Sequence, residues 1–138
     1  MWTYETTVNW SEGKKGETGS DGKPGIGIST PPEFGGPEGF WTPEDLLTSS
    51  VASCVLTSTL FFAEKGGIGL RSYKSKSTGT MEKTPAGLAI TGVKIEVSIE
   101  LEDAGQEAEI RKAVERAEKT CPISNSLKCP VEVALSVS

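Results

Sequence analysis

Two thiols lie on predicted helical faces in a chain that contains no histidine. Cys54 lies about two and a half turns inside a predicted helix, and Cys121 ends a second one, directly before Pro122. A thiol reacts as its thiolate, and no imidazole is present to take its proton. The pair indicates thiol chemistry without a histidine base, and peroxide reduction is the most economical use of such a pair.

Cys54 also has an inert interpretation, because a free cysteine is often simply a small buried side chain. Three features favour a functional site. The neighbours of Cys54 are small and hydroxylic, which leaves room for a substrate, and Glu44 and Asp45 at the helix start can organise a polar cluster. The preceding loop supplies aromatic side chains that could wall an apolar substrate pocket: Phe34, Phe40 and Trp41.

The two remaining cysteines differ in their surroundings. Pro122 interrupts the helix after Cys121, so the backbone there can shift and bring sulfurs together, since a disulfide needs Cα atoms within about 7 Å. Cys129, at the entry to the last predicted strand, is interpreted as a packed bystander. No metal site is predicted, because there is no histidine to add a ligand and the cysteine spacing matches no zinc or iron–sulfur pattern.

The composition limits the partners and the compartment. At 138 residues the chain has the size of one domain, residues 1–138. A net charge of −5 argues against nucleic acid and anionic membrane surfaces as partners. No apolar run approaches the roughly 20 residues of a membrane span, and the N-terminus does not have the regions expected of a secretory signal. We therefore expect a cytoplasmic protein without structural disulfides.

The central predicted helix has a clear start and end. Thr42 is its expected N-cap, Pro43 takes the first helical position, where a missing N–H costs nothing, and Asp45 can complete a capping box. Gly66-Gly67 ends the helix near Lys65. Because residues 46–63 carry no charge, we expect this helix to lie under a sheet and against another helix.

Alternation of apolar and polar residues predicts the strands. We expect an aromatic-faced strand, a glycine-bounded turn, a short return strand and, after the central helix, three further strands and one amphipathic helix. The ranges are 2–10 for the first strand, 11–17 for the turn, 26–28 for the return strand, 70–81, 88–101 and 130–137 for the later strands, and 106–121 for the second helix. This order of elements predicts the α+β class.

Two separated signatures resemble those of the OsmC/Ohr family of thiol-dependent hydroperoxide reductases. The first is Pro43-Glu44-x-Leu46 followed by Ala52-x-Cys54, with Glu44 ten residues before the cysteine. The second is Cys121-Pro122-x-Ser124-Asn125 before a final strand. The resemblance covers nearly the whole chain and keeps the order of the elements, so it is specific.

The resemblance implies an α+β, intertwined homodimer, with antiparallel sheets wrapped around two central helices and active sites at the subunit interface. It implies that Cys54 is the peroxidatic thiolate and Cys121 the resolving thiol, so that a Cys54 sulfenic acid becomes a Cys54–Cys121 disulfide. The implied substrates are organic hydroperoxides, with hydrogen peroxide as a further one. An external dithiol would reduce the disulfide, and no cofactor is implied.

One part of the family pattern differs here. The resemblance implies a carboxylate–guanidinium pair between Glu44 and an arginine after the first strand, but residues 11–16 contain no arginine. Lys14, or else Lys15, is the cation available in that loop, although lysine cannot form the planar bidentate pair. We expect Glu44 and Lys14 to hold the Cys54 thiolate. In the alternative interpretation the lysines are solvated and Glu44 is only a helix cap.

Two other functions remain open from the sequence. A divergent OsmC-like protein would bind a small apolar ligand in the same cleft, and the missing arginine favours that possibility. A redox sensor would use Cys54 and Cys121 as a switch with little peroxide turnover. Consumption of peroxide with a dithiol reductant distinguishes both from the peroxidase.

Overall fold

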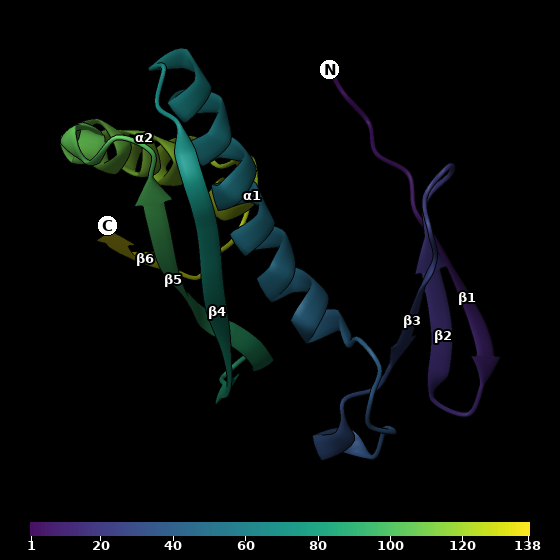
Figure 1. The fold of residues 1–138 in the computed structure, drawn as a ribbon. Coiled ribbons are helices and arrows are strands. Elements are labelled where there is room, and N and C mark those ends of the chain that lie inside the picture. The colour runs from purple at the N-terminus through teal and green to yellow at the C-terminus, as the bar shows by residue number, and fades with distance from the viewer. The chain divides into compact units, whose positions relative to one another are not determined.

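The computed structural model describes all residues from Met1 to Ser138, which form six strands and three α-helices (Figure 1). The strands make two three-stranded sheets. By their internal contacts the residues divide into two compact units, Met1–Leu47 and Thr48–Ser138. The α+β class that the sequence predicts is confirmed.

The first unit contains an antiparallel sheet in the order β1 (Thr7–Glu12), β2 (Lys15–Gly19) and β3 (Ile26–Ser29). The sequence predicts only two strands here, and that is wrong. The segment read as a long turn contains the start of β2. The turn between β1 and β2 is shorter than predicted, because Glu12 already pairs with Lys15. Gly13 in this turn adopts a positive φ of 54°, and the register of β1 is irregular just before it.

After β3, the chain runs through a short 3₁₀ helix, η1 (Pro32–Phe34), towards the first α-helix. The Ser29 N–H donates a hydrogen bond to the Trp41 carbonyl at 2.9 Å, which ties the end of this loop to β3. Ser29 and Thr42 are buried here, but none of the buried core apolar side chains lies in the first unit. A small sheet without an apolar core needs other contacts for its stability.

Helix α1 (Pro43–Lys65) begins as its sequence predicts. The Asp45 N–H donates to Thr42 Oγ1 at 3.1 Å, and the Thr42 N–H donates to Asp45 Oδ2 at 3.1 Å. The capping box is therefore confirmed. At the other end the Gly66 N–H donates to the Phe62 carbonyl at 3.0 Å, and Gly67 leaves the helix with a φ of 65°.

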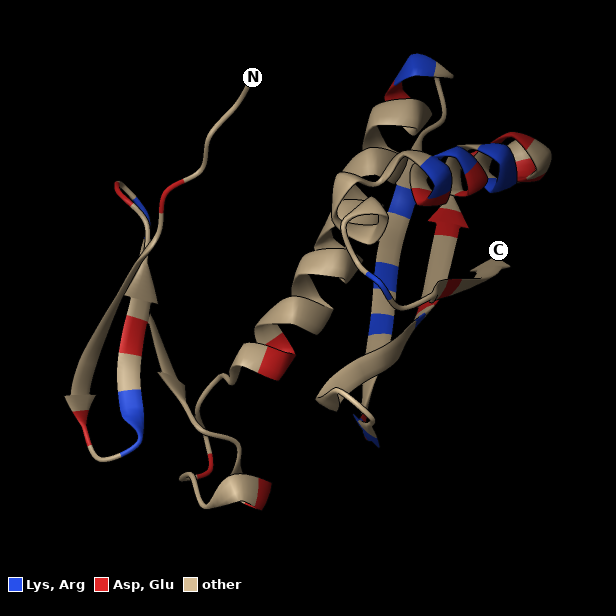
Figure 2. Cartoon of the chain, turned by 180° about the vertical axis from the view of Figure 1, so that it is seen from behind, with Lys and Arg blue, Asp and Glu red and all other residues tan.

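The expectation that no apolar run is long enough to span a membrane is wrong. By length and composition alone α1 could cross one, with 23 residues and few charges. Figure 2 shows α1 as tan between the acidic residues of its first turn and the charged residues at its end. A single such helix is weak evidence of a span, because a core helix passes the same test.

The sheet of the second unit has the order β4 (Leu70–Thr84), β5 (Gly87–Leu101) and β6 (Val131–Val137). β4 and β5 form the predicted antiparallel hairpin, closed by the pairing of Thr84 with Gly87. β5 and β6 are parallel, so the expectation of purely antiparallel sheets is wrong for this pair. A helical connection between them returns the chain to the same end of the sheet, as parallel pairing requires.

That connection contains η2 (Ala104–Gln106), α2 (Glu107–Thr120) and α3 (Pro122–Asn125). The predicted helix over 106–121 therefore corresponds closely to α2. Proline does not stop helical structure here. It takes the first position of α3 instead, where its missing N–H is not needed. Cys121 is the residue between the two helices, at the N-cap of α3.

The core of the second unit lies between α1, α2 and the sheet. Apolar stripes of the two helices pack with alternate residues of β5, as the 3.6-residue and two-residue periods predict. Figure 1 shows α1 running alongside β4. The buried apolar side chains of these elements are Val51, Val55 and Ala63 of α1, Val93, Ile95, Val97, Ile99 and Leu101 of β5, and Ile110, Ala113, Val114 and Ala117 of α2.

Candidate active site

The second unit brings Cys54 and Cys121 together. Both cysteines are free thiols, and each thiol alters the pKa of the other, so the two side chains are neighbours. Cys54 comes from the middle of α1 and is half-buried, whereas Cys121 is 0% exposed. The two thiols therefore differ in access: a molecule from solvent can approach Cys54 more readily than Cys121.

The first turn of α3 directs hydrogen-bond donors at the Cys121 sulfur. The Ser124 N–H donates to Cys121 Sγ at 3.4 Å, so the thiol acts as the N-cap of α3. The Ile123 N–H also interacts with the sulfur. The buried Ser124 hydroxyl has no hydrogen-bond partner of good geometry, but it lies close enough to Cys121 to stabilise a negative charge there.

These contacts move the two thiol pKa values in opposite directions. Burial alone would raise the pKa of Cys121, but hydrogen bonds from Cys54, Ser124 and Ile123 outweigh it and lower that pKa. The pKa of Cys54 is raised, first by burial and then by the neighbouring Cys121 thiol.

Ser58 is the second side chain next to Cys54. Its hydroxyl lies 3.9 Å from Cys54 Sγ, one helical turn further along α1. The hydroxyl and the Ile123 N–H both lower the pKa of Cys54 but do not offset the factors that raise it. Apart from Cys121, the polar groups next to Cys54 are therefore the Ser58 hydroxyl and the Ile123 N–H, and both are neutral.

In the first unit, Lys14 and Glu44 line one pocket, with a volume of about 390 Å³. The turn before β2 carries Lys14, and the first turn of α1 carries Glu44. Lys14 Nζ donates to the Phe34 carbonyl at 3.2 Å. A Cβ added at Gly35, whose φ is 87°, would lie 2.6 Å from Lys14 Nζ, so the glycine makes room for the ammonium group.

Lys15 has other partners. Its Nζ lies 3.8 Å from Glu12 Oε1 and 5.3 Å from the centre of the Phe40 ring. Both contacts are at the surface, where an ion pair contributes little stability. Both lysines therefore approach the segment after β3, but Lys14 donates to a backbone carbonyl there, whereas Lys15 lies over an aromatic ring.

The three aromatic residues expected to wall a pocket lie elsewhere in the first unit. Phe34 and Trp41 are exposed, and the Phe40 ring packs over Gly27. None of them lines the pocket of Lys14 and Glu44, whose apolar lining comes from strand and loop residues instead: Val8, Trp10, Ile28, Pro31 and Pro43. A role of Phe34, Phe40 and Trp41 in substrate binding stays a prediction.

Three neighbours of the thiols have no role predicted from the sequence, although Ser124 is part of the second signature. They are Ser58, Ile123 and Ser124. A signal for Ser58 exists, because it follows Cys54 by four residues in a helix. A signal for α3 exists too, since a residue before proline followed by a short polar stretch is a typical helix start. Cys129 packs against the core, as expected for a bystander.

The sequence is similar to a family profile and to individual proteins. The profile of the OsmC-like protein family matches residues 35–136. The uncharacterised protein YmaD of Bacillus subtilis is 27% identical over 136 residues, which cover 95% of this chain and 90% of that protein. An organic hydroperoxide resistance protein of Xanthomonas axonopodis is 28% identical over 113 residues, 80% of this chain and 77% of that protein.

Solved structures have the same fold. An OsmC-like protein of unknown function from Vibrio cholerae superposes with a TM-score of 0.91 at 19% identity, over 99% of this chain and 100% of that one. An organic hydroperoxide resistance protein from Legionella pneumophila superposes with a TM-score of 0.77 at 28% identity, over 100% and 98%. With its matching profile and its α+β fold, this chain belongs to the OsmC-like protein family.

Proposed function

We propose that this protein is a thiol-dependent peroxidase that reduces organic hydroperoxides with Cys54 and Cys121. Family membership and relatives named for organic hydroperoxide resistance support a role in peroxide resistance. The observation that carries the finer proposal is the proximity of two free thiols of unequal exposure in one unit. The more exposed thiol, Cys54, attacks the peroxide, and the buried one, Cys121, resolves the product.

The chemistry needs no cofactor. The Cys54 thiolate attacks the distal oxygen of the hydroperoxide, the O–O bond breaks, and an alkoxide leaves and takes a proton to become an alcohol. Cys54 is then a sulfenic acid. Cys121 attacks its sulfur, a disulfide forms and water leaves. An external dithiol returns both cysteines to thiols, and we place this cycle in a reducing, cytoplasmic compartment.

Hydroperoxide consumption by the purified protein with a dithiol reductant tests this proposal. Sustained turnover supports the peroxidase. The apolar pocket of about 390 Å³ in the first unit favours a second candidate, a protein that binds a small apolar ligand. Ligand binding without any hydroperoxide consumption would favour that candidate. Thiol oxidation without turnover would indicate a redox sensor.

We further propose that Lys14 supplies the cation of the site, with Glu44 as its carboxylate partner. Both line the same pocket of the first unit, and the family resemblance implies a cation beside the reacting thiol, where it would stabilise the alkoxide as it leaves. We expect Lys14→Ala to slow the reaction with an organic hydroperoxide by about 100-fold, as the loss of one such donor does in other enzymes. Stopped-flow measurement of peroxide reduction gives this rate.

Lys15→Ala is the matched control for that measurement. It removes an equal charge from the adjacent position, together with the surface contacts to Glu12 and Phe40. The expected rate is that of the wild-type protein. Equal losses in the two variants would mean that the charge of the turn acts only at a distance, and no loss in either would remove the cation from the mechanism.

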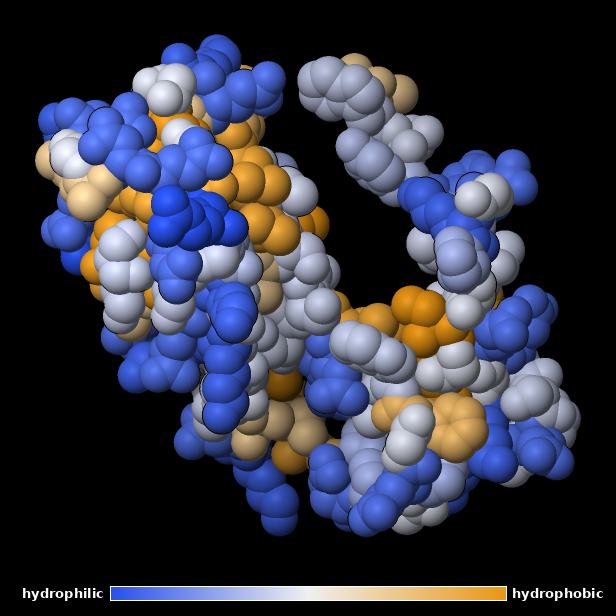
Figure 3. Space-filling model, in the orientation of Figure 1, coloured by the Kyte–Doolittle hydropathy of each residue, from blue (hydrophilic) through white to orange (hydrophobic).

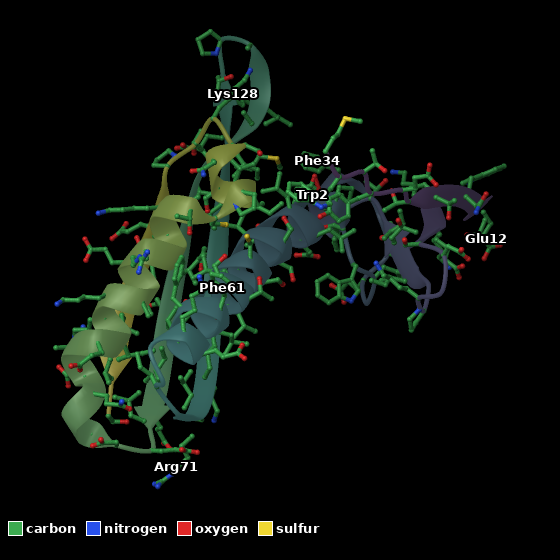
Figure 4. The ribbon with its side chains drawn as sticks, turned by 90° about the horizontal axis from the view of Figure 1, so that it is seen from above. Trp2, Glu12, Phe34, Phe61, Arg71 and Lys128 are labelled. Carbon is green, nitrogen blue, oxygen red and sulfur yellow. The ribbon has the colours of Figure 1, made fainter.

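We also propose that the protein is a homodimer, as the family resemblance implies. The first unit contains none of the buried core apolar residues, and Val8 and Trp10 on β1 are 66% and 77% exposed. In the second unit, Leu60 and Phe61 of α1 are 44% and 52% exposed. Figure 3 shows hydrophobic atoms gathered over α1, and Phe61 projects from it in Figure 4. A second copy of the chain would cover such surfaces.

Sedimentation equilibrium is expected to give the mass of a dimer at micromolar concentration. Phe61→Glu should weaken the dimer, because a carboxylate would be buried at the interface. Circular dichroism of the same sample distinguishes a folded monomer from an unfolded chain. A wild-type protein that stays monomeric and folded at these concentrations would contradict the proposal.

A further inference from the structure

A second pocket lies within the second unit, between the end of α1 and one face of α2, and has a volume of about 280 Å³. Each helix contributes one face, because residues three, four and seven positions apart lie on the same side of a helix. The lining residues are Phe62, Lys65, Gly66 and Ile68 on one side and Glu109, Lys112, Ala113 and Arg116 on the other. None of them is a hydrogen-bond or electrostatic partner of Cys54 or Cys121.

The floor of this pocket is apolar. Ile68 and Ala113 are 8% and 5% exposed, and Phe62 is half-buried. The guanidinium carbon of Arg116 lies 4.6 Å from the centre of the Phe62 ring. A cation–π contact therefore holds one positive charge over the apolar floor.

The charges around the pocket are unbalanced. Lys65, Lys112 and Arg116 line it together with a single carboxylate, Glu109, although the whole chain has a net charge of −5. None of the three cations forms an ion pair. Lys112 and Arg116 are also like charges four residues apart in α2, which disfavours a helix. An anion in the pocket would relieve that repulsion.

The neighbouring face of α2 has a different arrangement of charges. Arg111 pairs with Glu107 at 3.2 Å, and Lys119 pairs with Glu115 at 3.3 Å. Both pairs join residues four apart and lie at the surface (Figure 2). The cations of α2 that face solvent are thus paired, whereas those that line the pocket are not.

The end of α1 does not neutralise the pocket either. A helix C-terminus presents free carbonyl groups, which carry partial negative charge. Here the N–H groups of residues 66–68 donate to the carbonyls of residues 62–64 at distances from 2.8 to 3.1 Å. Because these carbonyls already accept hydrogen bonds within the chain, the lysine and arginine side chains remain available to a ligand.

We propose that this pocket binds a small organic carboxylate, independently of the thiols. The carboxylate lies beside the three cations, where the planar guanidinium of Arg116 suits its two oxygens. The apolar body of the ligand covers Phe62, Ile68 and Ala113. A volume of about 280 Å³ is just below the usual range of ligand pockets, which begins at about 300 Å³, so the ligand is small.

Isothermal titration calorimetry with octanoate as the probe tests the proposal on the whole protein. Acetate and 1-octanol are the comparison ligands, because acetate lacks the apolar body and 1-octanol lacks the charge. We expect octanoate to bind about tenfold more tightly than either, or better. Added salt should weaken the binding of octanoate, since its carboxylate interacts with cations at the rim.

Arg116→Gln is expected to weaken octanoate binding about tenfold or more, because a charge-assisted hydrogen bond is lost. Arg111→Gln is the matched control. It removes an equal charge from the same helix but only breaks the surface ion pair with Glu107, so we expect wild-type affinity. Arg116→Lys keeps the charge without the planar fork and should lie between the two. Circular dichroism checks the fold of each variant.

The apolar pocket of the first unit, which carries Lys14, is the competing location for octanoate. Shifts of backbone amide signals in nuclear magnetic resonance distinguish the two, and we expect them at residues 62–68 and 109–116. Shifts confined to the first unit, equal losses in Arg116→Gln and Arg111→Gln, or acetate and octanoate binding equally well would each overturn the proposal. So would an absence of octanoate binding. The proposed peroxidase is unaffected by any of these results, because the assay involves neither thiol.

Discussion

Cys121→Ser is expected to lose catalytic turnover: one hydroperoxide molecule per active site gives the Cys54 sulfenic acid, and only overoxidation of Cys54 consumes more. Without Cys121 the Cys54 sulfenic acid has no neighbouring thiol in contact, so the internal disulfide cannot form. Further hydroperoxide then oxidises Cys54 to the sulfinic acid, which a dithiol does not reduce. Multiple-turnover assays give the loss of turnover, and mass spectrometry identifies the overoxidised residue.

The matched control for this variant is Cys129→Ser. Cys129 is half-buried and packs against the core, and its thiol has no role in the proposed cycle. We expect full turnover and an unmodified Cys54 after the assay. If Cys121→Ser keeps full turnover while Cys129→Ser loses it, the resolving role belongs to Cys129.

Cys54→Ser is expected to lower hydroperoxide consumption to that of the dithiol reductant alone. A hydroxyl at this position is neither ionised at neutral pH nor easily oxidised, so the first step has no nucleophile. The residual Cys121 thiol stays buried and should remain reduced for many wild-type turnover times. Consumption assays and thiol quantification measure both effects.

Ser58→Ala controls for damage to the helix around Cys54. It removes the hydroxyl that lies 3.9 Å from Cys54 Sγ and keeps both thiols. We expect it to retain most of the turnover, because Ser58 only assists the Cys54 thiol. A Ser58→Ala variant as inactive as Cys54→Ser would mean that the packing of α1, and not the thiol, determines activity.

The sequence predicts the fold where local patterns decide it. The alternation from Val93 to Leu101 identifies the buried face of β5, and the capping box of Thr42 and Asp45 identifies the start of α1. It predicts β2 and the parallel pairing of β6 poorly. A glycine turn does not reveal how tight it is, and the direction of pairing depends on where a crossover helix returns the chain.

The candidate site, like the fold, is predictable only where local sequence patterns decide it. Helical positions and the two OsmC/Ohr-like signatures select Cys54 and Cys121 from the three cysteines, whereas a following proline does not, because Cys129 also precedes one. The donors around Cys121 come from backbone N–H groups of α3, which every residue except proline carries, so residue types do not reveal them. The order of the two thiol pKa values follows from those donors and therefore needs the structure.

Peptide mapping of the protein after one equivalent of an organic hydroperoxide tests the central claim most directly. The account predicts that Cys54 and Cys121 are joined in a disulfide within one chain, that Cys129 remains a free thiol, and that a dithiol restores all three thiols. An unreacted Cys54–Cys121 pair, or a disulfide that involves Cys129 instead, would contradict the account.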